Sequence, residues 1–240
     1  MTRNRLLEIG ALAGISAALV TALSVPPEQT QGDLARMLFV HVPSIWLAYL
    51  SFTVTLVASA AYLRTKSLRW DRVAGSSAEI GVVFTAAALL SGMIWGKPTW
   101  GVWWTWDARL VLTAVLFFVY LGYLALRRSI EDPATRARRS ALFGMLAIVQ
   151  IPIVHFSVVW WRTLHQQASL VRPGGLQMDP PFVAAFGAAL VAFTVVYAAL
   201  LARRVDLARI EDDIEAALRR QDLPVAGAAV VAPELGGPHV

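Results

Sequence analysis

Residues 110–126 read LVLTAVLFFVYLGYLAL, a run of seventeen residues without a charged side chain. A helix needs about 20 mostly apolar residues to cross the hydrocarbon core of a bilayer, so this run with its flanks is typical of a membrane span. The whole chain of 240 residues is 57% hydrophobic and 15% charged, whereas soluble domains are about 45–50% apolar and about 25% charged. These proportions exclude an ordinary soluble domain, a disordered chain and a fibrous one.

Five further stretches on either side of this run are also long and apolar enough to be membrane spans. The six predicted spans are Leu6–Val25, Leu38–Leu63, Ile80–Trp95, Leu110–Leu126, Ser140–Trp160 and Phe182–Ala202. We therefore predict an all-α integral membrane protein with six transmembrane helices. Pro152 cannot donate a backbone hydrogen bond, so we expect the fifth helix to kink. The first stretch follows Arg3 and Arg5 and is alternatively a signal peptide, although it exceeds the ~7–15 apolar residues of that class.

Lys and Arg are distributed unequally between the two sides of the predicted spans. Sixteen of the 21 cations fall on the side that holds both termini. The other five are Arg36, Lys97, Arg109, Arg162 and Arg172. Because cytoplasmic loops are enriched in Lys and Arg, we predict that both termini are cytoplasmic and that the loop between the third and fourth helices is periplasmic.

The chain after the last predicted span has a different character. Residues 203–222 place Leu207, Ile210, Ile214 and Leu218 on one helical face, which predicts a cytoplasmic helical tail. This helix is either a solvated extension or a docking helix for a cytoplasmic partner. We expect residues 1–202 to form the transmembrane domain and the Ala-, Gly- and Pro-rich residues 223–240 to be disordered.

The loop between the third and fourth spans, residues 95–109, reads WGKPTWGVWWTWDAR. Trp is common in the belts that anchor helices at membrane interfaces, but a belt needs only one or two at each helix end. Five Trp in one short loop offer flat apolar surfaces with indole N–H groups, which suits a large planar apolar ligand. The predicted platform consists of Trp95, Trp100, Trp103, Trp104, Trp106 and Asp107.

Three His lie near the same membrane face as the Trp-rich loop, and imidazole is a common axial ligand of heme iron. The chain contains no Cys, which excludes thiolate ligands and covalent heme attachment through thioethers. His41 opens the second span and His165 follows the fifth, so both lie level with the loop. We predict that these two hold the iron. His155 is an alternative, but it lies about 15 Å from His165 along a continuous helix and deeper in the membrane.

Cations on this face are suited to the propionates of a heme. Arg36 precedes His41 by five residues and Arg109 closes the Trp-rich loop, so these two are our candidates for propionate contacts. Asp107 has no evident metal to bind, and we expect it to pair with Arg109 or another cation or to accept hydrogen bonds from indole groups.

Together, His41–Pro43, the loop Trp95–Arg109 and the segment Trp160–Gln166 resemble the WWD family of heme-handling proteins, named for its Trp-rich loop. They are most similar to its cytochrome c maturation protein C group, over about residues 36–200. The resemblance implies that His41 and His165 are the axial ligands of a transiently bound, non-covalent heme b and that the Trp-rich loop is the porphyrin platform.

This resemblance also implies a place in the cell. The protein would lie in the bacterial inner membrane, present heme on its periplasmic side and deliver it to the heme chaperone CcmE for cytochrome c maturation by system I. It would be a transfer subunit of an ABC-type complex with CcmA, CcmB and CcmD, not an enzyme, and no nucleic acid would be involved.

Two other functions remain open at the level of sequence. One is an enzyme, either a heme-dependent membrane oxidoreductase or a component of a cytochrome c synthetase-type heme lyase. The other is a transporter or structural subunit whose Trp-rich loop is only an interfacial belt. The chain has no Walker motif for ATP hydrolysis.

Overall fold

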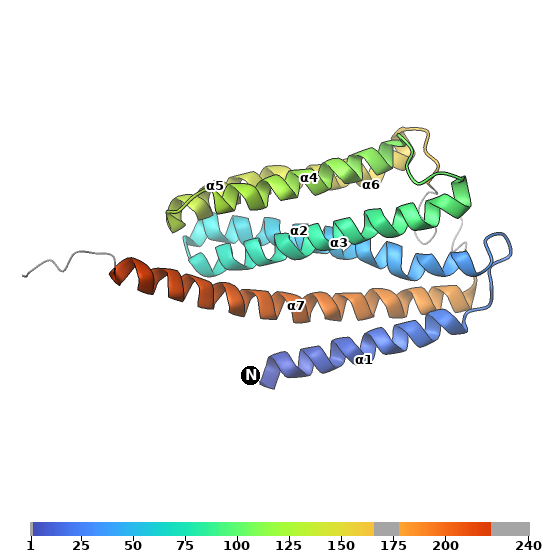
Figure 1. The fold of residues 1–240 in the computed structure, drawn as a ribbon, viewed down its shortest axis with the longest axis horizontal. Helices are drawn as coiled ribbons and strands as arrows, with labels where there is room; N and C mark the ends of the chain where they lie inside the picture. The colour runs from blue at the N-terminus through green and yellow to red at the C-terminus, as the bar shows by residue number, and fades with distance from the viewer. Residues whose placement is uncertain (1, 166–177, 222–240) are drawn as a thin grey trace, which may run out of the picture.

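The computed structural model describes residues 2–165 and 178–221, which form seven α-helices and one short 3₁₀-helix (Figure 1). The elements are α1 (Thr2–Ser24), η1 (Asp33–Met37), α2 (Leu38–Thr65), α3 (Leu68–Trp100), α4 (Ala108–Arg128), α5 (Pro133–Ala147), α6 (Gln150–Trp160) and α7 (Pro180–Gln221). Within the described residues there is no β-sheet. The region expected to be disordered, 223–240, lies outside them, as does Arg172.

Six helical segments are long and apolar enough to cross a membrane, which confirms the predicted fold class. Five of the spans contain α1, α2, α3, α4 and α7, and the remaining span, Pro133–Trp160, combines α5 with α6. In a bilayer every backbone polar group needs an internal partner, and helices meet that need within one segment. The six apolar runs of the sequence therefore translate directly into six spans.

The combined α5–α6 span is interrupted one turn before Pro152. Proline has no N–H to donate to the carbonyl four residues earlier, which belongs to Ile148. The Ile151 N–H donates to the Ile148 carbonyl instead, at 3.0 Å, and the Val149 N–H donates to the Leu146 carbonyl at 3.3 Å. These shorter-range bonds separate α5 from α6, which agrees with the kink expected near Pro152.

The helices pack as a central pair with a group on each side (Figure 1). α2 and α3 pack extensively against each other, with α4, α5 and α6 on one side and α7 on the other. α1 packs mainly on α7, where a Cβ at Gly14 would lie 3.5 Å from the Cα of Ala192. Small residues allow such close approach between helices in membranes.

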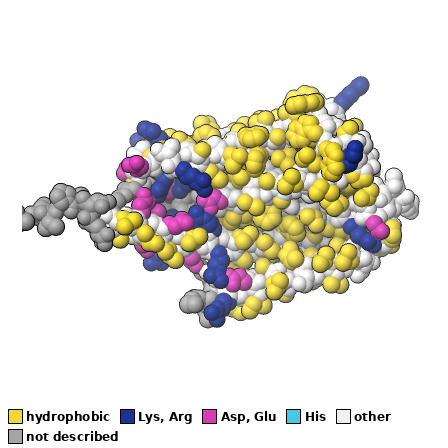
Figure 2. Space-filling model, in the orientation of Figure 1, with side chains coloured by type: hydrophobic (Ala, Val, Ile, Leu, Met, Phe, Trp, Pro, Cys, Tyr) yellow, Lys and Arg dark blue, Asp and Glu magenta, His cyan; other side chains and the backbone are white. Residues whose placement is uncertain are grey.

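The two ends of the bundle differ in composition. The Arg-rich end contains the start of α1, the α2–α3 and α4–α5 connections and the last part of α7 (Figure 1). The Trp-loop end contains η1, the start of α2, the end of α3, residues 101–107 and residues 161–165. Figure 2 shows a broad apolar surface between the ends, with most of the visible charged side chains gathered near the projecting end of α7.

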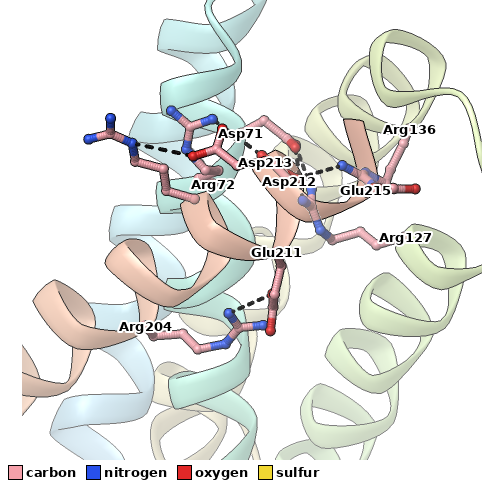
Figure 3. Close-up of polar contacts among 10 residues, drawn as sticks. Asp71, Arg72, Arg127, Arg136, Arg204, Glu211, Asp212, Asp213 and Glu215 are labelled. Atoms are coloured by element: carbon pink, nitrogen blue, oxygen red, sulfur yellow. Dashed lines mark hydrogen bonds and ion pairs between the residues drawn. The ribbon is translucent and has the colours of Figure 1, made fainter. Parts of the chain in front are cut away.

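α7 continues from Pro180 to Gln221 without a break, so the helical tail expected from residue 203 is an extension of the sixth span. Ion pairs fasten this extension to the bundle (Figure 3). Asp212 pairs with Arg72 of α3 at 3.2 Å and with Arg136 of α5 at 3.4 Å. Arg204 bonds Glu79 of α3 as well as Glu211 of its own helix.

Candidate functional site

The Trp-rich segment is only partly a loop. α3 continues through Trp95 to Trp100, although Gly96 and Pro98 suggested a loop from residue 95 onward. The helix ends at Gly101, whose φ of 81° is accessible to glycine and whose N–H bonds the Lys97 carbonyl at 3.0 Å. Trp95 and Trp100 therefore stand on the last turns of a helix, whereas the other three Trp lie on residues 101–107.

Asp107 joins the Trp-rich segment to the residues that follow α6. Its carboxylate caps α4 by accepting from the N–H groups of Arg109 at 2.9 Å and Leu110 at 3.4 Å. It also accepts from the Leu164 N–H at 2.8 Å and lies 3.1 Å from Nδ1 of His165. The side chain is only 3% exposed. Burial opposes ionisation, but hydrogen bonds from Thr163 and Leu164 outweigh it and hold the pKa of Asp107 below its usual value.

His165 lies between Asp107 and Trp100. The imidazole meets the Trp100 ring edge-on, with 5.0 Å between the ring centroids. Burial of the ring, with help from the nearby charge of Arg109, lowers the pKa of His165, although the Asp107 carboxylate opposes this shift. The ring is therefore neutral at pH 7, as a metal ligand must be.

His41 approaches from the first turn of α2. Its Nδ1 lies 3.2 Å from the Ser91 hydroxyl, and its ring meets Trp95 edge-on at 5.9 Å between centroids. A Cβ at position 92 would lie 2.9 Å from Cε1 of His41, so Gly92 leaves the space that the ring occupies. His41 and His165 are also close enough that a charge on one acts on the other.

The side chains of Ser91 and Asp107 each meet their imidazole at Nδ1. Ionised Asp107 has no proton to give, so Nδ1 of His165 must donate. In the tautomer that places the proton of His41 on Nδ1, the Ser91 oxygen accepts from Nδ1 and its hydroxyl donates to the Ala88 carbonyl at 3.2 Å. Nε2 of each ring then carries a lone pair that is available to a ligand.

The remaining candidate residues occupy different positions. Arg36 is already engaged, since it pairs with Asp33 at 2.7 Å and donates to the Val25 carbonyl at 2.8 Å. Arg109 donates to the backbone carbonyl of His155 at 3.3 Å, and its charge acts on both His41 and His165. The His155 side chain is exposed on α6, so this residue supports the site through its backbone.

Some Trp side chains are held by a hydrogen bond, whereas others are open, meaning that they are largely exposed. Trp95 donates through Nε1 to the side chain of Gln31 at 2.8 Å, whereas Trp106 is 86% exposed and Trp103 is 54% exposed. A pocket of about 420 Å³ beside Asp107 is lined by Thr105, Trp106, Asp107, Arg162, Thr163 and Leu164. Sequence reasoning missed Gln31, Ser91 and Thr163, because common polar residues carry no signal of their own.

The fold defines a multi-pass membrane protein in which His41, His165 and the Trp-rich segment lie at one end of the helical bundle. The chain belongs to the heme exporter protein C family, which it matches over residues 2–220. The match includes α1 and nearly all of α7, so it extends beyond the residues 36–200 for which the sequence showed a resemblance.

Individual relatives agree with this assignment. The chain is 38% identical over 207 residues to the heme exporter protein C of Bradyrhizobium diazoefficiens, covering 83% of this chain and 79% of the relative. It is 39% identical over 170 residues to the protein of that name from Haemophilus influenzae, covering 70% of this chain and 65% of the relative. A putative cytochrome c biosynthesis ccmC-like mitochondrial protein of Marchantia polymorpha is 38% identical over 149 residues, which cover 62% of this chain and 63% of the relative.

Proposed function

We propose that this protein binds heme at its Trp-loop end, with Nε2 of His41 and of His165 as the two axial ligands. The observation that carries the proposal is that both imidazoles meet polar side chains of the protein through Nδ1, an arrangement that leaves Nε2 for the iron. Two neutral imidazoles suit a six-coordinate heme, which offers no open position to oxygen. The bound heme supplies the iron that these ligands hold, and the protein supplies the ligands, the aromatic surface and the cations.

The surroundings of the two imidazoles support the same ligand. The open Trp side chains provide apolar ring surface next to the site, and a porphyrin ring has matching faces. Arg109 is the stronger candidate for a propionate, because its described hydrogen bond is to a backbone carbonyl. Arg36 is weaker, because Asp33 already neutralises it.

The names of the relatives extend the proposal from binding to transfer. Those proteins are called heme exporters or cytochrome c biosynthesis proteins. We propose that this chain delivers its heme b to the chaperone CcmE in system I cytochrome c maturation, as a non-enzymatic subunit of a complex with CcmA, CcmB and CcmD. The concentration of Lys and Arg at the end that holds both termini favours a site on the periplasmic side of the inner membrane.

The test is the absorption spectrum of the purified protein with heme, oxidised and reduced, for the parent and for His41→Ala and His165→Ala. We expect a low-spin spectrum from the parent and a high-spin spectrum or loss of heme from either variant. His155→Ala is the matched control, because its exposed side chain should leave the spectrum unchanged. A low-spin spectrum that survives both substitutions would refute the ligand assignment.

A further inference from the structure

We infer that Asp107 is a positioning residue that fixes the proton and the orientation of the His165 ring and makes His165 the stronger of the two electron donors to heme iron. The inference rests on the proposed function, because it assumes that His165 binds the iron. It assigns to Asp107 a role different from the platform and cation-pairing roles that the sequence suggested.

The first step is the geometry of the carboxylate. One oxygen, Oδ1, receives the N–H groups of Arg109 and Leu110 and faces Nδ1 of His165, while Oδ2 receives the Leu164 N–H. These donors come from the start of α4 and from the segment after α6. Asp107 therefore holds the backbone next to His165 as well as its ring, so neither can rotate independently.

The second step is the position of the proton. A carboxylate that already accepts from three backbone N–H groups is ionised and accepts without donating, so the imidazole proton stays on Nδ1 and the lone pair stays on Nε2. A carboxylate on the far nitrogen raises the basicity of a ligating imidazole, because it stabilises positive charge on the ring. Nε2 of His165 consequently donates more electron density to a bound metal.

The third step is a contrast between the two candidate ligands. Nδ1 of His41 faces the neutral Ser91 hydroxyl, whereas Nδ1 of His165 faces a carboxylate whose side chain is 3% exposed. Hydrogen bonds to an ionised acceptor are roughly twice as strong as those between neutral groups. The two axial nitrogens are thus unequal, and the charge of Asp107 favours the ferric over the ferrous state.

The experiment compares Asp107→Ser and Asp107→Asn with the parent in the full-length protein, and measures the affinities for ferric and for ferrous heme. Ser is as good a helix N-cap as Asp but is too short to reach His165, and Asn keeps the size without the charge. The matched control is Asp132→Ser, because Asp132 caps α5 by accepting from the Thr135 N–H at 2.7 Å.

We expect both Asp107 variants to lose about 10- to 100-fold in ferric heme affinity, the usual effect of removing such a partner. The ratio of ferric to ferrous affinity should fall about tenfold, which corresponds to a rise of about 59 mV in the one-electron potential. Ser91→Ala should change that ratio less than either Asp107 variant, and Asp132→Ser should leave it unchanged.

Each other outcome has a defined meaning. Parent-like affinities in both Asp107 variants would overturn the inference. Equal losses for ferric and ferrous heme would also overturn it, because they would show a packing role without an effect of the charge. Heme that stays low-spin in His165→Ala would instead refute the proposed ligand, whatever the Asp107 variants do.

Discussion

The Arg-rich end and the Trp-loop end of the bundle differ in how their side chains are paired and exposed. At the Arg-rich end, Arg127 of α4 forms two hydrogen bonds with Asp71 of α3, at 2.5 and 2.9 Å, and the two side chains are 14% and 5% exposed. At the Trp-loop end, each candidate imidazole uses one nitrogen for the protein, and Trp106 is 86% exposed.

This difference separates stability from binding. Removing one partner of a buried ion pair strongly destabilises the folded protein, because the other charge stays buried without a partner. The ion pairs at the Arg-rich end therefore stabilise the fold. Exposed rings and imidazole lone pairs contribute little to folding, and in the proposed function they contact the heme. Substitutions at the two ends should therefore affect different measurements.

The largest effect on stability should come from Arg127→Ala. Removing this guanidinium leaves the Asp71 carboxylate buried without its partner, which costs about 3–5 kcal/mol in the free energy of unfolding. Equilibrium unfolding in detergent measures the loss, and heme bound per folded molecule should not change. The exposed neighbour Arg128 gives the control, since Arg128→Ala should change the unfolding free energy by less than about 0.5 kcal/mol. A fully stable Arg127→Ala protein would remove the distinction between the two ends.

Trp106→Ala should show the converse behaviour. The exposed indole contributes little to folding, so the unfolding free energy should change by less than about 0.5 kcal/mol. Loss of aromatic contact with heme should weaken binding by about 0.5–1.5 kcal/mol in a heme titration. Trp70, at the Arg-rich end of α3, serves as the control because Trp70→Ala should leave heme affinity intact. Unchanged affinity in Trp106→Ala would exclude its indole from the platform.

The smallest effect should come from the exposed part of the ion-pair network. Asp212 is 30% exposed and pairs with Arg72 and Arg136 at 3.2 and 3.4 Å, so solvent screens the attraction (Figure 3). Asp212→Asn should reduce the unfolding free energy by at most about 1 kcal/mol. A loss as large as that of Arg127→Ala would mean that the whole network behaves as one buried unit.

The sequence is a good guide to the fold wherever the signal is local. Uninterrupted apolar runs predict the six spans, and Pro152 predicts the disturbance of the fifth because the missing N–H belongs to that residue. The end of α3 is harder to predict. Gly96 and Pro98 suggest a loop, yet the helix persists to Trp100 and ends at Gly101, which adopts a φ of 81°.

The candidate site is predictable in its residue types but not in its contacts. The number and spacing of His and Trp point to a ligand site, and the assignment of His41 and His165 as axial ligands stays a prediction. Asp107 was expected to pair with a cation or an indole, whereas the structure places it against His165. Only tertiary packing brings these segments together, because 58 positions separate the two residues along the chain. The pair of Arg36 with Asp33, in contrast, lies within a single turn, but Arg36 was expected to contact a propionate and this pair was not predicted.

The long separation between Asp107 and His165 also has a consequence for the biosynthesis of the protein. With 58 positions between them, a ribosome adding about 5–20 residues per second reaches His165 about 3–12 s after Asp107. During that interval α4, α5 and α6 must be made and inserted before the carboxylate meets its imidazole. A nascent chain that stops before residue 160 can hold the Trp-rich segment in the membrane but lacks the second imidazole. The proposed site, which needs both histidines, is thus completed late in synthesis, when most of the spans have already been made.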